Sequence, residues 1–185
     1  MRKLSAFLSL SLNGCFADAE GGVDWAHSTD PDYLRFVAGN AQGGGALLMG
    51  HRTYEMMAAW WPSEPARRAM PEVAEGMNRM PKYLVSRHPR RPEWAHTVQL
   101  DGALHEAVAA LKREQGPDIA ILGSGSLVTQ LAEAALIDEF QFVVCPVVLP
   151  KGRPVFEEVG AMLSLRLVET RAFGSGHVFL RYRSG

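Results

Sequence analysis

The chain of 185 residues has little cysteine and almost no net charge, and each shortage excludes a class of protein. Its two cysteines, Cys15 and Cys145, form no CxxC pair and have no metal-like spacing to histidine. This argues against a disulfide framework and against a structural zinc site, so we expect no metal and a reducing, cytoplasmic setting. The formal net charge of -1 lacks the basic excess of a general nucleic-acid binder, so we expect no nucleic-acid partner.

Long apolar runs are also missing, and without a run long enough to span a bilayer we expect no membrane partner. The first residues, MRKLSAFLSLSLNGC, have the basic start and the cysteine of a secretory or lipoprotein signal. However, apolar residues from Leu4 to Leu12 occupy every second position, with Ser5, Ser9 and Ser11 between them. A period of two is typical of a half-buried strand, which we favour over a signal.

Short apolar runs and helical patterns alternate along the rest of the chain, without an internal repeat. This order predicts an α/β fold with a mixed, mainly parallel sheet, helices on both faces and an antiparallel C-terminal hairpin. The length suits a single domain over residues 1–185. We expect further strands at 46–49, 82–86, 97–100, 118–122, 138–148, 163–167 and 178–182, helices at 30–40, 52–61, 103–115 and 126–135, and an irregular or short helical connection at 65–81.

The stretch AILGSGSLVTQL, residues 120–131, ends a predicted strand in Gly-Ser-Gly-Ser and begins a helix at once. A helix start offers unpaired N–H groups and the positive end of a dipole, so it is suited to anions. No lysine follows, which excludes a Walker A loop, and Val128 replaces the third glycine of a Rossmann fingerprint. The alternative is a plain strand–helix turn with Ser126 as the N-cap.

Two other predicted strands also end in residues that suit anions. Gly50, Arg52 and Thr53 follow one strand, and Ser86 and Arg87 follow another, with more basic residues behind them. Ligands of open α/β sheets bind beyond the carboxyl ends of the strands, so the three ends could meet one ligand with several phosphates. The alternatives are a Thr53 N-cap with a solvated arginine, and a solvated basic loop.

Five segments carry a resemblance to a known family: SLSLNG, LLMGHRTYE, PKYLVSR, LGSGSLVTQLAEAALIDEF and PVVLPKGRPVF, in this order from Leu4 to Phe156. Together they resemble the dihydrofolate-reductase-like superfamily. Within it, they are similar to the reductase (C-terminal) domain of the bifunctional riboflavin-biosynthesis deaminase–reductase and to its stand-alone relatives. The resemblance implies an NADPH-dependent reductase on a mixed eight-stranded sheet, with a small-molecule substrate and often as a homodimer.

The resemblance also implies roles for residues at the three strand ends. Ser86 and Arg87 would lie by the adenine and the ribose 2′-phosphate, which favours NADPH over NADH. The phosphates of the adenosine half would be held by Gly50, His51, Arg52 and Thr53, and the pyrophosphate by Gly123, Ser124, Gly125, Ser126 and Leu127. Three positions depart from the family pattern: Asn13 stands where aspartate is usual, His51 where arginine is common, and Pro150-Lys151 where glycine is common. The zinc deaminase signature is absent.

The implied chemistry is hydride transfer to a C=N or C=O carbon, whose heteroatom then needs a proton. Asp32 is the candidate acid, and Trp25 could wall the substrate pocket. Asn13 and Gly14, just past the first strand, could frame the nicotinamide. The alternatives are an acidic residue favoured by the helix dipole for Asp32, core packing for Trp25, and a plain turn for the pair.

The function that follows is hydride transfer from NADPH to a small heterocycle or a ribosylaminopyrimidine-type substrate. This would resemble the 5-amino-6-(5-phosphoribosylamino)uracil reductase of riboflavin biosynthesis. Three alternatives remain open: a pterin reductase like dihydrofolate reductase, a non-catalytic NADP-binding module, and an unrelated phosphosugar- or nucleotide-binding enzyme that uses residues 123–126 for a single phosphate.

Overall fold

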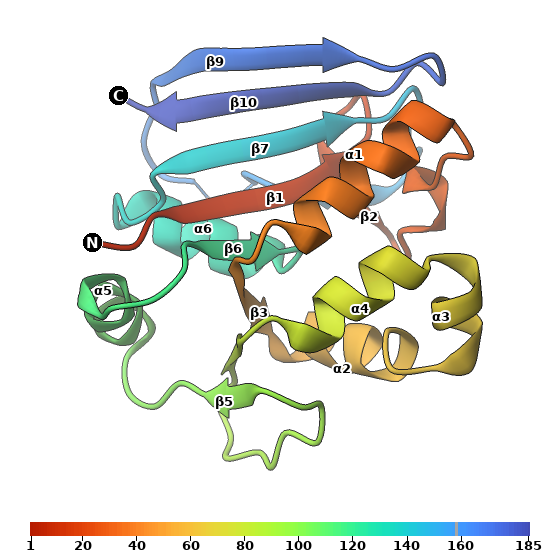
Figure 1. Cartoon of the computed structure of the whole chain (residues 1–185). Helices are drawn as coiled ribbons and strands as arrows, with labels where there is room; N and C mark the ends of the chain where they lie inside the picture. Colours follow the sequence, from red (N-terminus) through yellow and green to blue (C-terminus); the bar gives the residue numbers. More distant parts are fainter. Residues whose placement is uncertain (158) are drawn as a thin grey trace.

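A mixed sheet forms the centre of the computed structural model, which describes residues 1–157 and 159–185 (Figure 1). Its eight strands lie in the order β5-β4-β3-β6-β1-β7-β10-β9. The six strands from β5 to β7 are parallel, whereas β10 is antiparallel to β7 and β9. The predicted mixed sheet with an antiparallel C-terminal hairpin is therefore confirmed. The strands are β1 (Leu4–Leu10), β3 (Ala46–Gly50), β4 (Lys82–Val85), β5 (Thr97–Gln99), β6 (Ile119–Leu122), β7 (Glu139–Val144), β9 (Leu165–Ala172) and β10 (Val178–Ser184).

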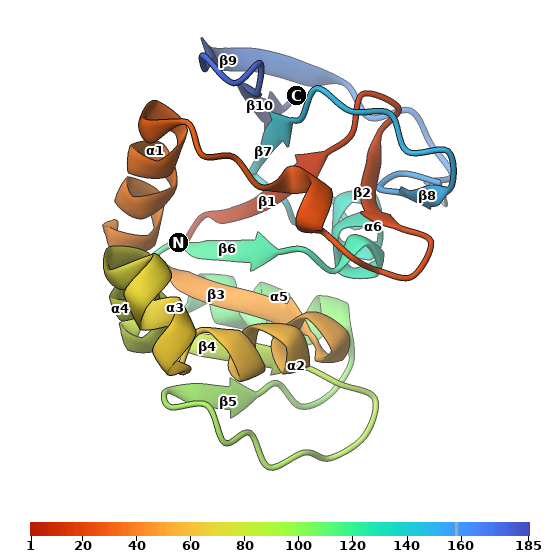
Figure 2. The same ribbon diagram turned by 90° about the vertical axis from the view of Figure 1, so that its right-hand side faces the viewer.

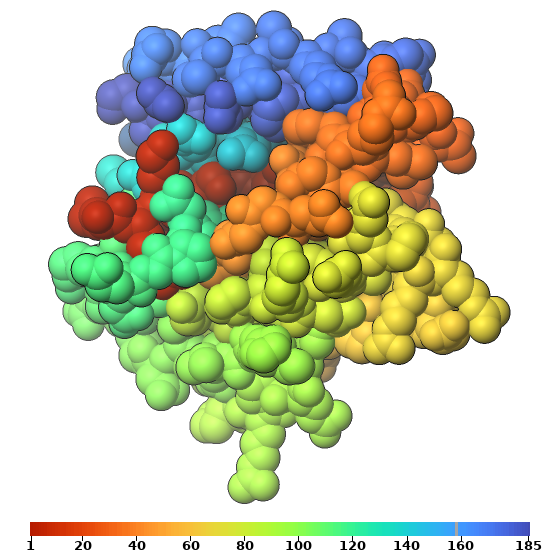
Figure 3. Space-filling model, viewed as in Figure 1, coloured from red at the N-terminus to blue at the C-terminus, as the bar shows by residue number. Residues whose placement is uncertain are grey.

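Helices cover both faces of this sheet (Figure 2). One face packs against α5 and α6, and the other carries α1, α2, α3 and α4, of which α1 and α4 cover much of the surface in Figure 3. Within the described residues, no helix has both the length and the apolar character needed to cross a membrane. The helices are α1 (Pro31–Gln42), α2 (His51–Trp60), α3 (Glu64–Ala69), α4 (Pro71–Arg79), α5 (Leu104–Arg113) and α6 (Gly125–Glu133), with a 3-10 turn at Asp24–Ala26.

The alternation in β1 separates the two layers of the core. Leu4, Ala6 and Leu8 are buried in the cluster beneath α5 and α6, whereas Phe7 packs on the side of α1. β1 ends at Leu10 rather than at Leu12, which is 63% exposed. The chain turns away there because the Leu12 N–H donates to Val147 O instead of continuing the strand ladder.

Helix α1 begins where the sequence predicts. The Asp30 side chain accepts hydrogen bonds from the Asp32 and Tyr33 N–H groups, at 2.8 and 3.2 Å, and Pro31 opens the first turn. An N-cap has an extended backbone and a short side chain that accepts a hydrogen bond, and proline suits the first helical position. The sequence Asp-Pro therefore predicts a helix start.

At two other helix starts, the N-cap is not the residue that the sequence suggested, which was Thr53 or Ser126. Helix α2 begins at His51 with Gly50 as its N-cap, so Thr53 is its third residue and caps nothing. Helix α6 begins at Gly125 after Ser124, which makes Ser126 the second residue of the helix. The reason is that Ser124 adopts the left-handed conformation (φ 57°, ψ 61°) and turns the strand directly into the helix.

A second, two-stranded sheet was not predicted. It pairs β2 (Cys15–Asp18) with β8 (Gly152–Pro154) in antiparallel fashion and lies beyond the carboxyl end of β1 (Figure 2). These strands have only four and three residues, so the strand pattern in each is weak.

Candidate functional site

A cavity lies where the parallel strands end. β3 pairs with β4 on one side and with β6 on the other, so the segments after the three strands meet at one edge of the sheet. The cavity has a volume of about 1030 Å³ and is lined by the segments after β3, β4 and β6 and by both strands of the small sheet. Gly123 is the one residue predicted to bind the cofactor that does not line the cavity, and it directly precedes four residues that do. The predicted residues that line it are Gly50, His51, Arg52, Thr53, Ser86, Arg87, Ser124, Gly125, Ser126 and Leu127.

The starts of α2 and α6 both line this cavity. The first N–H groups of a helix have no partner within it, and the helix dipole makes that end positive. Neither α2 nor α6 has an acidic residue in its first turn or a side chain that caps it. Every other helix in the described part of the chain, the 3-10 turn included, has an acidic residue there. The two helices at the cavity therefore begin without an acid in the first turn; the next acid along α2 is Glu55, whose Oε1 lies 2.9 Å from His51 Nε2.

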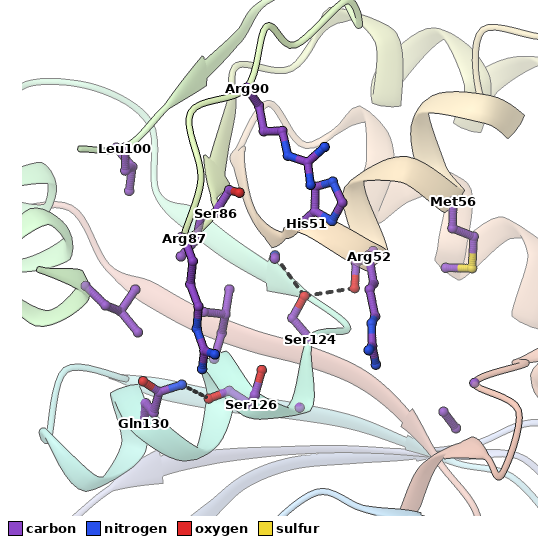
Figure 4. Close-up of a pocket in the computed structure, with 18 of the residues that line it drawn as sticks. His51, Arg52, Met56, Ser86, Arg87, Arg90, Leu100, Ser124, Ser126 and Gln130 are labelled. Carbon is purple, nitrogen blue, oxygen red and sulfur yellow. Dashed lines mark hydrogen bonds between the residues drawn. The ribbon is translucent and has the colours of Figure 1, made fainter. Parts of the chain in front are cut away.

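Glycine and serine bring these helix starts close together (Figure 4). Ser124 Oγ accepts a hydrogen bond from the Gly50 N–H at 2.8 Å and lies 2.8 Å from Thr53 Oγ1. A Cβ atom on Gly50 would lie 2.9 Å from Ser124 Oγ, and one on Gly125 would lie 2.3 Å from the Phe16 ring. Both positions therefore need a residue without a side chain, and Gly123 adopts a φ of 55°, which glycine reaches without strain.

Cations dominate the cavity wall. Four arginines line it, Arg52, Arg87, Arg90 and Arg153, and none forms an ion pair with a carboxylate in the described residues. Glu20 is the one carboxylate among the described lining residues. With two positive helix ends beside them, these side chains suit a ligand that carries several negative charges.

The basic loop after β4 is anchored by a buried lysine. Lys82 Nζ donates to three backbone carbonyls, including Met80 O at 2.7 Å and Ala95 O at 3.1 Å, and lies 4.4 Å from the centre of the Trp94 ring. The Trp94 N–H in turn donates to Tyr54 Oη at 3.0 Å. Burial lowers the pKa of Lys82 to about 8. Because these contacts fix the far end of the loop, they help to place Arg87 at the cavity.

The residues predicted at the substrate end do not line the cavity. Asp32 is exposed in the first turn of α1, where it forms an ion pair with Arg35. Trp25 packs in the aromatic cluster beneath α1, and its Nε1 donates to Gly22 O at 3.2 Å. These positions agree with the interpretations of Asp32 as a helix-start acid and of Trp25 as a packing residue.

Asn13 and Gly14 also lie outside the cavity lining. Asn13 Nδ2 donates to Leu149 O at 2.9 Å, and its Oδ1 accepts from the Leu149 N–H at 3.1 Å. Asn13 therefore fastens the end of β1 to the loop after β7. Gly14 supplies the positive φ of 79° that the turn into β2 requires, as the plain-turn interpretation has it.

Several lining residues were given no role from the sequence, among them Phe16, Glu20, Met56 and Arg153. Arg153 Nη2 donates to Ala19 O at 3.3 Å, so β8 supports the turn that carries Glu20. This contact joins residues 134 positions apart, and nothing local in either segment announces it. Only the pairing of β2 with β8 brings them to the cavity.

A family model described as the RibD C-terminal domain matches residues 2–179. The chain belongs to the RibD C-terminal domain family. The uncharacterized Bacillus subtilis (strain 168) protein YyaP is 29% identical over 186 residues, which cover 98% of this chain and 94% of YyaP. This family membership confirms the resemblance seen in the five sequence segments.

Solved structures confirm the dihydrofolate-reductase-like fold. A protein from Shewanella sp. PV-4, assigned provisionally to riboflavin biosynthesis, superposes with a TM-score of 0.74 at 20% identity, covering 99% of both chains. Dihydrofolate reductase from Enterococcus faecalis, complexed with NADP(H), superposes with a TM-score of 0.64 at 16% identity, covering 99% of this chain and 96% of that one. This RibD C-terminal domain protein therefore has a dihydrofolate-reductase-like fold.

The cavity of this RibD C-terminal domain also has apolar surface for flat rings. In the view of Figure 4, Leu100 and Met56 lie on opposite sides of Ser124. Leu100 belongs with Leu104 to the wall beside β4, and Met56 projects from the second turn of α2. The arrangement can hold a long ligand whose charged centre lies at the helix starts and whose ends are apolar.

Proposed function

We propose that this protein is an NADPH-dependent reductase that transfers hydride to a small heterocycle or a ribosylaminopyrimidine-type substrate. One observation carries the proposal: the starts of α2 and α6, with no acid in their first turns, line one cavity together with four arginines that form no ion pair among the described residues. A dinucleotide has a charged centre between two flat rings, which is the pattern of this cavity. Membership of the RibD C-terminal domain family supports the reductase class and a riboflavin-type substrate.

The residues present fit this cofactor. The N–H groups of Arg52 and Thr53 on α2 and of Ser126 on α6 would bind the pyrophosphate oxygens. Ser86, Arg87 and Arg90 would hold the adenosine end, where an additional 2′-phosphate would meet Arg87. When bound, NADPH supplies the hydride from its nicotinamide ring. The task of the chain is to fix distance and orientation and to supply charge complementarity.

A proton must also reach the reduced substrate, and we assign its delivery to Glu20. It is the one carboxylate of the described cavity lining, whereas Asp32 lies elsewhere in an ion pair with Arg35. The turn that carries Glu20 is fixed on both sides: Asp18 Oδ1 accepts from the Gly22 N–H, and Arg153 donates to Ala19 O. Glu20→Gln should reduce turnover at least tenfold while leaving the dissociation constant for NADPH within about twofold.

A non-catalytic NADP-binding module is the second candidate. It is favoured by the absence of Asp32, Asn13 and Trp25 from the cavity, since these were the residues expected to serve the substrate. Under this interpretation the charged centre of the cavity binds the dinucleotide, but no substrate binds beside it to accept the hydride.

Two measurements test these functions in sequence. Titration with NADPH and then NADH, followed by quenching of tryptophan fluorescence, should show tighter binding of NADPH. The consumption of NADPH with ribosylaminopyrimidines, pterins and quinones should then identify an acceptor. Binding without turnover of any acceptor would support the non-catalytic module, and no binding of either dinucleotide would refute both functions.

A further inference from the structure

Ser124 has a backbone conformation that serine rarely adopts. It lies in the left-handed region (φ 57°, ψ 61°) between two glycines, although glycine would adopt this conformation without strain. Its hydroxyl does not cap the helix that it precedes. Because the Ser124 side chain does not stabilise its own helix, contacts elsewhere must stabilise this strained conformation.

The hydroxyl acts on the neighbouring helix instead. Ser124 Oγ is 2.8 Å from the Gly50 N–H that it accepts from, and 2.8 Å from Thr53 Oγ1. Gly50 is the N-cap of α2 and Thr53 is its third residue, so both contacts are at the start of that helix. Figure 4 shows the two bonds converging on one oxygen. The approach is so close that a Cβ on Gly50 would lie only 2.9 Å from it.

We propose that Ser124 is a positioning residue whose hydroxyl sets the separation of the α2 and α6 starts. The inference rests on the proposed function, in which one pyrophosphate bridges these two positive ends. A pyrophosphate has two phosphorus centres at a fixed separation, so it binds both ends well only when they are held at a matching distance. By accepting from Gly50, Ser124 also leaves the N–H groups of Arg52 and Thr53 to the ligand.

The test compares a ligand that bridges both helix starts with one that uses a single phosphate there. Affinities for NADP⁺ and for adenosine 2′,5′-bisphosphate are measured by calorimetry on wild type, Ser124→Ala and Ser124→Gly. Both variants should bind NADP⁺ about tenfold more weakly and the bisphosphate at most about twofold more weakly, as the loss of one hydrogen bond predicts. Ser63→Ala removes a helix-start hydroxyl that caps α3, away from the cavity, and should change neither affinity.

Ser124→Gly separates positioning from a role in folding alone. Glycine relieves the left-handed strain, so this variant should unfold at or above the temperature at which Ser124→Ala unfolds. If Ser124 served only the fold, Ser124→Gly would bind NADP⁺ as wild type does, which would overturn the proposal. Equal losses for both ligands would also overturn it. If wild type failed to bind NADP⁺, the proposed function would fall and this inference with it; wild-type binding with unchanged variants would refute the inference alone.

Discussion

An acidic residue at the start of α6 should stabilise the protein and block its ligand at the same time. Ser126 is the second residue of α6, exposed and on the cavity wall, and the first turn of this helix has no acid. Ser126→Asp therefore adds to α6 what every other described helix except α2 already has. The carboxylate would meet the positive end of the dipole, the place where the proposed function puts phosphate.

The two effects have opposite signs and different sizes. A carboxylate in the first turn contributes about 0.3–1 kcal/mol to the free energy of unfolding. In a chain of this length that raises the unfolding temperature by about 1–4 °C. A negative charge about 4 Å from a phosphate costs between about 1 and 4 kcal/mol, depending on solvent exposure. We therefore expect NADPH binding to weaken by between about fivefold and about a thousandfold.

Thermal unfolding and fluorescence titration measure the two effects on the same samples. Ser126→Asn is the matched control, since it has nearly the same shape without the charge, and it should bind NADPH within about threefold of wild type. Added salt should narrow the gap between the two variants, because it screens the repulsion. If Ser126→Asp bound NADPH as tightly as Ser126→Asn, the start of α6 would not be a phosphate site.

Three further predictions follow from other parts of the site. Arg87→Ala should weaken the binding of NADPH about tenfold more than the binding of NADH, whereas Arg91→Ala, which changes a loop arginine outside the cavity lining, should weaken neither. Equal losses of affinity for the two dinucleotides would refute the assignment of the 2′-phosphate to Arg87. Gly125→Ala should lower the free energy of unfolding by about 1–3 kcal/mol, because its Cβ would lie 2.3 Å from the Phe16 ring; in a Phe16→Ala background, the same substitution should cost much less in chemical denaturation. Burial lowers the pKa of Lys82 from 10.5 to about 8 in the folded state, so between these pH values the unfolded chain binds more protons than the folded chain. The unfolding free energy of wild type relative to that of Lys82→Met should therefore rise as the pH is raised from about 8 to about 10. A difference that does not change with pH would mean that the backbone carbonyls keep the Lys82 ammonium charged.

The sequence was sufficient to predict the sheet and the edge at which the cavity lies. Alternation in β1 and the Asp-Pro start of α1 are local signals, since they depend on residues within a turn or a strand. The strand ends after Gly50, Ser86 and Leu122 could be read in the same way, and the parallel order of the strands then brings them together.

What could not be predicted depends on contacts between distant segments. β2 and β8 become strands only by pairing with each other, and Glu20 and Arg153 reach the cavity through that pairing. The Ser126 N-cap alternative was wrong because Ser124 turns left-handed, which follows from its bonds to Gly50 and Thr53 in a different helix. Sequence spacing placed Asp32 correctly at a helix start but could not show that α1 begins away from the cavity.

The central place of β1 has a consequence for the order in which the chain can fold. Its two neighbours are β6 and β7, so Leu4–Leu10 pairs only with residues 119–122 and 139–144. On the ribosome, β1 is made well before β6 and β7, so it must wait until both of its neighbours exist. Pairings so distant in sequence slow folding, and we expect this nascent chain to depend on protection from aggregation until β7 has left the exit tunnel.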